Sequence, residues 1–314
     1  MKKRIAALVL MGVMAFSMTA CGDSSAEGTT SGSSETEAAS DESSTEETAS
    51  AEGMTGAISV ISREDGSGTR GAFIELFGIE EENADGEKVD NTTADASVSN
   101  STAVVMTNVA QDPQAIGYIS LGSLDDSVKA LKVDGAEASV ENVKNDSYKI
   151  SRPFNIATKD DVSEVAQDFI DYIMSAEGQQ IVEESGYIAV DDAAEAYAGS
   201  KPSGKVVVAG SSSVTPVMEK LKEGYEAVNS GAEIEIQQSD STTGMESTVN
   251  GICDIGMASR ELKDSEIEAG LKGQEIALDG IAVIVNNKNS MNDITTDQVK
   301  DIYTGEITEW SDLQ

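Results

Sequence analysis

Three segments of the sequence combine glycine with Ser and Thr hydroxyls, each between an expected strand and an expected helix. They are Arg63–Thr69 (REDGSGT), Gly210–Pro216 (GSSSVTP) and Ser239–Gly244 (SDSTTG). Such a loop leaves free backbone N–H groups at the positive end of a helix dipole, surrounded by hydroxyl donors. One such loop is weak evidence, because Ser and Thr cap helices in most proteins. Three in one chain, with Arg63 in one of them, predict a site for a small oxyanion.

The composition excludes several other kinds of site. Among its 314 residues the chain has no His and only two Cys, at positions 21 and 253. His-based catalytic triads, His metal ligands, a disulfide framework and a Cys-based zinc site are therefore excluded. We expect no metal and no cofactor, and we expect Cys253 to be a small buried side chain.

The charge excludes a further class of partner. Lys and Arg number 21 against 57 Asp and Glu, which gives a formal net charge of −36. Nucleic-acid binding is disfavoured because it needs a basic face that displaces counterions from phosphates.

The loops also allow two enzymatic interpretations, a dinucleotide site and a Ser nucleophile. Gly66, Gly68 and Gly71 match the G-x-G-x-x-G dinucleotide pattern, but no second strand ending in an acid follows about 20 residues later. In the second interpretation a Ser nucleophile would act on a phosphoester. Because the chain has no His, the general base that activates this Ser would have to be a Lys. The sequence favours a binding protein over an enzyme.

From Gly56 onward, short apolar runs alternate with amphipathic stretches, which predicts an α/β fold with largely parallel sheets. Strands are expected at 57–61, 115–120, 128–133, 205–209, 233–236 and 276–286, and helices at 71–77, 161–184 and 216–228. The small, polar and breaker-rich segment 191–204 is interpreted as a linker.

The N-terminal residues predict export. Residues 2–4 are basic and residues 5–20 are almost wholly apolar or small, as in a secretory signal peptide spanning 1–20. Cys21 stands at the cleavage point and resembles the lipidated Cys of a bacterial lipobox; an ordinary signal peptide with an incidental Cys is the alternative. Residues 21–55 are rich in Ser, Thr and Glu and predict a disordered acidic tether.

The segment Ile61–Phe73 (ISREDGSGTRGAF) resembles the central signature of bacterial phosphate-binding proteins, the substrate-binding subunits of the high-affinity phosphate ABC transporter. Further segments resemble the same family at 115–120, 210–216, 255–262, 277–283 and 302–310. Their order differs from the family's, in which the segment at 210–216 comes first. We therefore predict a circular permutation, with 191–204 bridging the family's usual termini; two misjoined partial copies are the alternative.

The resemblance implies a two-lobed type II periplasmic-binding-protein fold with the ligand in a cleft. Mapped onto this sequence, lobe one is 56–151 plus 285–314 and lobe two is 152–284. The chain would cross between the lobes near Ser151–Pro153 and near Val285–Asn286, which are the expected hinges.

The resemblance also implies a set of phosphate ligands. They are Arg63, Asp65, Ser67, Gly68, Thr69, Ser212, Ser213, Thr242, Thr243, Ser259 and Arg260, with the choice among the residues at 241–243 open. Arg63 would give a charged, bidentate contact. Asp65 can only accept a hydrogen bond, so it would select protonated phosphate and repel sulfate.

One position departs from the family pattern. Some family members carry Asp where this chain has Arg260, which leaves the rejection of sulfate open. A surface or interlobe salt bridge is the alternative role for Arg260. The implied partners are inorganic phosphate, permease subunits of an ABC transporter, and the membrane through a lipid on Cys21. We expect a monomer on the outer face of the cell membrane; a receptor for another tetrahedral oxyanion is the alternative.

Overall fold

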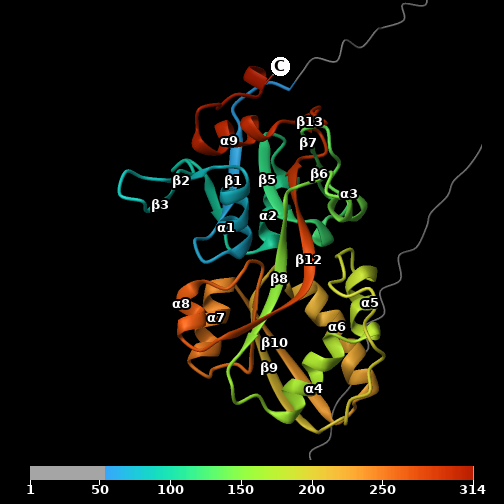
Figure 1. Cartoon of the computed structure of the whole chain (residues 1–314). Coiled ribbons are helices and arrows are strands. Elements are labelled where there is room, and N and C mark those ends of the chain that lie inside the picture. The colour runs from blue at the N-terminus through green and yellow to red at the C-terminus, as the bar shows by residue number, and fades with distance from the viewer. Residues whose placement is uncertain (1–53, 314) are drawn as a thin grey trace, which may run out of the picture. The chain divides into compact units, whose positions relative to one another are not determined.

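The computed structural model describes residues 54–313 (Figure 1). The predicted signal peptide, the lipidated Cys21 and nearly all of the predicted tether lie outside the described residues.

Strands and helices alternate along the described chain, as predicted. The strands are β1 (Ser59–Arg63), β2 (Glu80–Glu82), β3 (Lys88–Asp90), β4 (Ser97–Ser99), β5 (Ala115–Ser120), β6 (Lys129–Ala130), β7 (Lys132–Val133), β8 (Ser151–Thr158), β9 (Gly204–Ser211), β10 (Ala232–Ser239), β11 (Ile255–Ala258), β12 (Lys272–Val285) and β13 (Asp293–Ile294). The helices are α1 (Gly68–Leu76), α2 (Thr102–Gln111), α3 (Val140–Lys144), α4 (Glu164–Ile173), α5 (Ala176–Glu184), α6 (Thr215–Val228), α7 (Ser241–Val249), α8 (Asp264–Glu268) and α9 (Thr296–Thr304), with short 3₁₀ turns η1 (Leu121–Ser123) and η2 (Trp310–Leu313).

Most of the strands between residues 54 and 313 belong to one sheet, in the order β10-β9-β11-β8-β12-β5-β1-β4, with β6 also paired to β12. On one flank β9, β10 and β11 are parallel, and on the other β1, β4 and β5 are parallel. In the middle, β8 and β12 run antiparallel to each other and to their outer neighbours. The expected parallel sheets are therefore present on the flanks but not in the middle.

The apolar core is divided into two main clusters of buried residues. One forms around β1, α1, α2, β5 and α9, and we call these elements lobe one. The other forms around α4, α5, α6, β9 and β11. We call these elements, with the adjoining β10, α7 and α8, lobe two. Strands β8 and β12 lie side by side and connect the two groups (Figure 1).

The two connecting strands locate the crossing between lobes. Strand β12 pairs with β8 as far as Gly280 and with β5 from Ile281 onward. Residues Ile281–Val285 are buried in the lobe-one cluster. On β12 the crossing is therefore at Gly280–Ile281, earlier than the expected Val285–Asn286, because the apolar end of the strand already belongs to lobe one. On β8 the crossing is at the first residues of the strand, which are the expected Ser151–Pro153.

The single helix expected at 161–184 is instead two helices, α4 and α5. Ser175 lies between them, where its Oγ accepts a hydrogen bond from the Gly178 backbone N–H at 3.3 Å and donates to the Tyr172 carbonyl at 2.7 Å. A Cβ on Gly178 would lie 2.2 Å from the Tyr172 carbonyl oxygen, so glycine permits the tight turn. The strand expected at 128–133 is likewise two short strands, β6 and β7.

The segment expected to be a linker, 191–204, has no helix or strand before β9 but is fixed to lobe two. Tyr197 donates to the Asp168 carboxylate at 2.5 Å, and the Ser200 backbone N–H donates to it at 2.9 Å. Tyr225 of α6 donates to the same carboxylate at 2.8 Å. Burial, together with this contact to Asp168, raises the pKa of Tyr225 to about 12.

Candidate functional site

The first glycine loop connects β1 to α1. Ser67 is the N-cap of α1, and its Oγ accepts from the Arg70 backbone N–H at 3.3 Å. Gly68 and Thr69 form the first turn of the helix and are buried. The loop therefore places its free backbone donors and the Thr69 hydroxyl at a helix N-terminus, as the sequence predicted.

Three other strand-to-helix turns have the same design. Ser212 and Ser213 lie between β9 and α6, Ser241 begins α7 after β10, and Ser101–Thr102 begins α2 after β4. The four turns come from two lobes, and their hydroxyls meet. Ser101–Thr102 was not among the residues predicted from the sequence.

Buried hydroxyls from these turns, together with Ser211 at the end of β9 and Ser259 after β11, form one hydrogen-bonded group, which we call the hydroxyl cluster. Its members are Thr69, Thr102, Ser211, Ser212, Ser213, Ser241 and Ser259. Thr69 Oγ1 lies 2.9 Å from Ser213 Oγ and 3.3 Å from Ser259 Oγ. Ser213 Oγ lies 3.0 Å from Thr102 Oγ1. Lobe-one hydroxyls thus bond directly to lobe-two hydroxyls.

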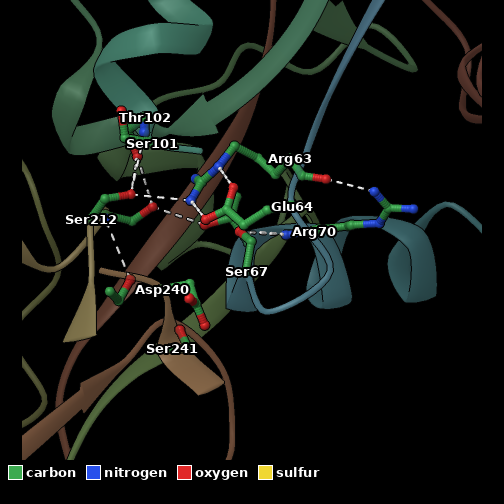
Figure 2. Close-up of polar contacts among 12 residues, drawn as sticks. Arg63, Glu64, Ser67, Arg70, Ser101, Thr102, Ser212, Asp240 and Ser241 are labelled. Atoms are coloured by element: carbon green, nitrogen blue, oxygen red, sulfur yellow. Dashed lines mark hydrogen bonds and ion pairs between the residues drawn. The ribbon is translucent and has the colours of Figure 1, made fainter. Parts of the chain in front are cut away.

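Arg63, the last residue of β1, extends its guanidinium into this cluster. The side chain is buried, and its Nη2 donates to Ser212 Oγ at 3.1 Å. The same guanidinium donates to Glu64 through Nε at 2.7 Å and through Nη2 at 2.6 Å. Figure 2 shows Arg63, Glu64 and Ser212 together, beside the turn that carries Thr102. The expected charged donor is therefore present, and it is already paired with a carboxylate.

A second arginine reaches the cluster from the connecting strand β8. Arg152 is buried and donates from Nη2 to Thr69 Oγ1 at 3.0 Å. Its Nη1 donates to Asp279 of β12 at 2.6 Å. Burial raises the pKa of Asp279 and lowers the pKa of Arg152, while their mutual attraction opposes both shifts. Arg152 thus connects the interlobe strands to the hydroxyl cluster.

Two glycines of the first loop are required by the close approach of lobe two. A Cβ on Gly68 would lie 2.6 Å from Ser241 Oγ and 2.8 Å from Ser259 Oγ. A Cβ on Gly66 would lie 2.2 Å from Asp240 Oδ1. A larger residue at either position would require the facing side chains of lobe two to shift.

Two expected ligands lie outside the cluster. The Asp65 side chain is 98% exposed and lies 3.6 Å from Arg70. Thr243 is exposed, and its backbone N–H and hydroxyl both bond to the Asp240 carboxylate that caps α7. At 241–243 the buried hydroxyl belongs to Ser241, the first residue of α7, and in the first loop the carboxylate that bonds to Arg63 is that of Glu64. The roles of Asp65 and Thr243 as phosphate ligands stay predictions.

Thr242 and Arg260 lie at the edge of the cluster. Arg260 donates to Thr242 Oγ1 at 3.3 Å and to both carboxylate oxygens of Glu266, at 2.7 and 2.9 Å. Burial alone would raise the pKa of Glu266, but hydrogen bonds from Arg260 and the Lys263 backbone outweigh it and lower that pKa. Of the two roles considered for Arg260, the structure shows an ion pair, and it lies within lobe two.

A cavity of about 580 Å³ adjoins the cluster, and its lining includes Thr102, Met106, Ser127, Ser212 and Gln238. Each arginine at the cluster or its edge has its own carboxylate: Arg63 has Glu64, Arg152 has Asp279 and Arg260 has Glu266. The site therefore offers many hydrogen-bond donors with little net charge, which suits an anion that loses its water on binding.

Comparison with known proteins defines the class. The model of the PBP superfamily domain matches residues 34–177 and 195–314, so the chain belongs to the PBP superfamily, and its fold is the type II periplasmic-binding-protein fold.

The particular family follows from full-length relatives. The chain is 61% identical over 259 residues to phosphate-binding protein PstS 2 of Streptococcus agalactiae, covering 82% of this chain and 88% of that protein. It is 40% identical over 312 residues to phosphate-binding protein PstS 2 of Streptococcus pneumoniae, covering 99% of both. It therefore belongs to the PstS family of phosphate-binding proteins.

A solved structure supports the same assignment. The crystal structure of a phosphate ABC transporter phosphate-binding protein from Streptococcus pneumoniae matches 82% of this chain and 100% of that one, with 44% identity and a TM-score of 0.66. Between residues 54 and 313, none of the helices combines the length and apolar character needed to cross a membrane.

Proposed function

We propose that this protein is a receptor for inorganic phosphate that delivers its ligand to an ABC-type permease and has no enzymatic activity. One observation carries the proposal: buried hydroxyls from both lobes, with the buried Arg63, converge on one place. Donors from two lobes around one small anion would hold the lobes together when it binds. The names of the PstS relatives support phosphate as that anion.

The proposed ligands follow from the geometry. Arg63 supplies charge, and the first turn of α1 supplies Ser67, Gly68 and Thr69. Lobe two supplies Ser212, Ser213 and Ser259, which hydrogen-bond to lobe-one groups in this structure. Hydroxyls that now bond to one another would turn to the phosphate oxygens.

We further propose that the chain is anchored by a lipid on Cys21 and acts as a monomer on the outer face of the cell membrane. The basic and then apolar residues of 1–20 support export. We also propose that the segments of this chain, in the order it shares with the Streptococcus pneumoniae PstS 2 protein, are circularly permuted relative to PstS proteins such as that of Bacillus subtilis. The match to Bacillus subtilis PstS covers only 43% of this chain and 42% of that one, which a changed segment order would produce.

Titration calorimetry tests the function. Phosphate should bind with about one ion per chain, and sulfate should compete weakly. Arg63→Ala should weaken phosphate binding at least tenfold, roughly the loss expected for a buried charged hydrogen bond. Lys144→Ala, which removes an exposed ion pair with Glu183, is the matched control and should bind as the native protein does. A folded native protein that releases no heat with phosphate would overturn the proposal.

A further inference from the structure

Selection of phosphate over sulfate, if the proposed function holds, needs an acceptor that the hydroxyl cluster does not provide. Hydrogen phosphate carries a P–OH at neutral pH, whereas sulfate carries no proton. A carboxylate facing the ligand can accept from P–OH and can only repel an unprotonated oxygen. Hydroxyls cannot discriminate in this way, because they both donate and accept.

Most carboxylates near the cluster are committed elsewhere. Asp65 is 98% exposed. Glu266 accepts from Arg260 and the Lys263 backbone, Asp279 accepts from Arg152 and the Gly122 backbone, and Asp240 accepts from Thr243. None of these carboxylates shares a donor atom with a hydroxyl of the cluster. The Arg152 nitrogen that donates to Asp279 is Nη1, whereas the one that donates to Thr69 is Nη2.

Glu64 is placed differently. A single nitrogen, Nη2 of Arg63, donates to Glu64 Oε1 at 2.6 Å and to Ser212 Oγ at 3.1 Å. An anion held by Arg63 and Ser212 would therefore have a carboxylate oxygen as its neighbour. The Glu64 backbone is fixed on both sides, since its N–H donates to the Ser99 carbonyl and its carbonyl accepts from Ser67.

Glu64 also keeps acceptor capacity. Each carboxylate oxygen accepts one hydrogen bond from Arg63, and each can accept another. We propose that Glu64, not Asp65, accepts the P–OH of hydrogen phosphate and so excludes sulfate. Arg63 then has two functions: it donates to the ligand and it holds Glu64 in place.

The test compares three anions on three proteins. Native protein, Glu64→Gln and Asp65→Asn are titrated with phosphate, arsenate and sulfate by calorimetry, and circular dichroism confirms that each is folded. Arsenate is tetrahedral and protonated like phosphate. It therefore distinguishes selection by the proton on the anion from selection by the central atom. For Glu64→Gln the ratio of sulfate Kd to phosphate Kd should fall at least tenfold, because the amide can donate to an unprotonated oxygen. Arsenate affinity should fall in parallel with phosphate affinity.

The outcomes are distinct. Asp65→Asn should leave the ratio unchanged; a collapse of the ratio in Asp65→Asn, with Glu64→Gln unaffected, would assign the acceptor to Asp65. If Glu64→Gln binds all three anions more tightly by the same factor, Glu64 competes for Arg63 and the proposal is overturned. If the phosphate and sulfate affinities fall by the same factor, Glu64 only positions Arg63, and the proposal again fails. Absence of phosphate binding to the native protein would instead overturn the proposed function.

Discussion

At the scale of single residues, the site depends on which of two nearby residues in a loop points its side chain into the protein. Glu64 and Asp65 are adjacent, yet Glu64 bonds to the buried Arg63 and Asp65 faces solvent. Ser241 and Thr243 differ in the same way. The loop sequence predicted the hydroxyl-rich turns and Arg63, because residue types alone define them. It could not predict orientation, which depends on where the helix begins and on which side chain caps it.

Gly68 gives a prediction at this scale. Gly68→Ala would place a methyl group within 3 Å of Ser241 Oγ and Ser259 Oγ. The lobe-one loop and lobe two could then not approach as closely, and phosphate affinity measured by calorimetry should fall about tenfold or more. Gly71→Ala is the control in the same helix, because a Cβ there has no neighbour within 4 Å. Equal affinities for the two variants would show that this contact is not needed for binding.

At the scale of elements, the two arginines outside β1 depend on strands and helices that fix them. Arg152 lies opposite Asp279 in the β8–β12 ladder, so the pair is a cross-strand contact. The sequence showed both residues, but their pairing depends on register, which the hydrophobic pattern of two long buried strands does not define. Arg260 is held instead by α8, a short helix that supplies Glu266.

The Arg260–Glu266 pair predicts a pH dependence. The pKa of Glu266 is lowered from its reference of 4.5 in the folded protein, so its contribution to stability is present above about pH 4.5 and is lost as the pH falls through the lowered folded value. Glu266→Gln should lower Tm at pH 7, by about 2–4 °C for each kcal/mol lost, and the difference from the native protein should shrink towards pH 3.

Thermal melts across this pH range test the prediction. Glu268→Gln, at an exposed position of the same helix, is the matched control and should follow the native curve. A constant difference between Glu266→Gln and native protein at every pH would show that the pair does not couple folding to protonation.

At the scale of the whole molecule, local donors must capture an anion against the charge of the chain. The formal net charge is −36, and each arginine around the site is matched by a carboxylate. Long-range attraction therefore cannot bring phosphate to the site. Binding must come from helix N-termini, buried hydroxyls and short-range contacts to Arg63.

This balance predicts an inverted salt dependence. Raising KCl from 10 to 150 mM shortens the Debye length from about 30 Å to about 8 Å, which screens the repulsion by distant carboxylates but reaches the buried donors much less. The phosphate Kd should therefore decrease with salt, by roughly two- to fivefold, whereas binding at an exposed basic patch would weaken.

Calorimetry in KCl, with sucrose at matched osmolality as the control, measures this dependence. Sucrose should leave the Kd unchanged, because it does not screen charge. A Kd that rises steadily with KCl but not with sucrose would mean that phosphate is drawn in by an unscreened positive field at the cleft. In this structure Arg63, Arg152 and Arg260 are each paired with a carboxylate. That result would contradict the idea that phosphate binds to this paired state.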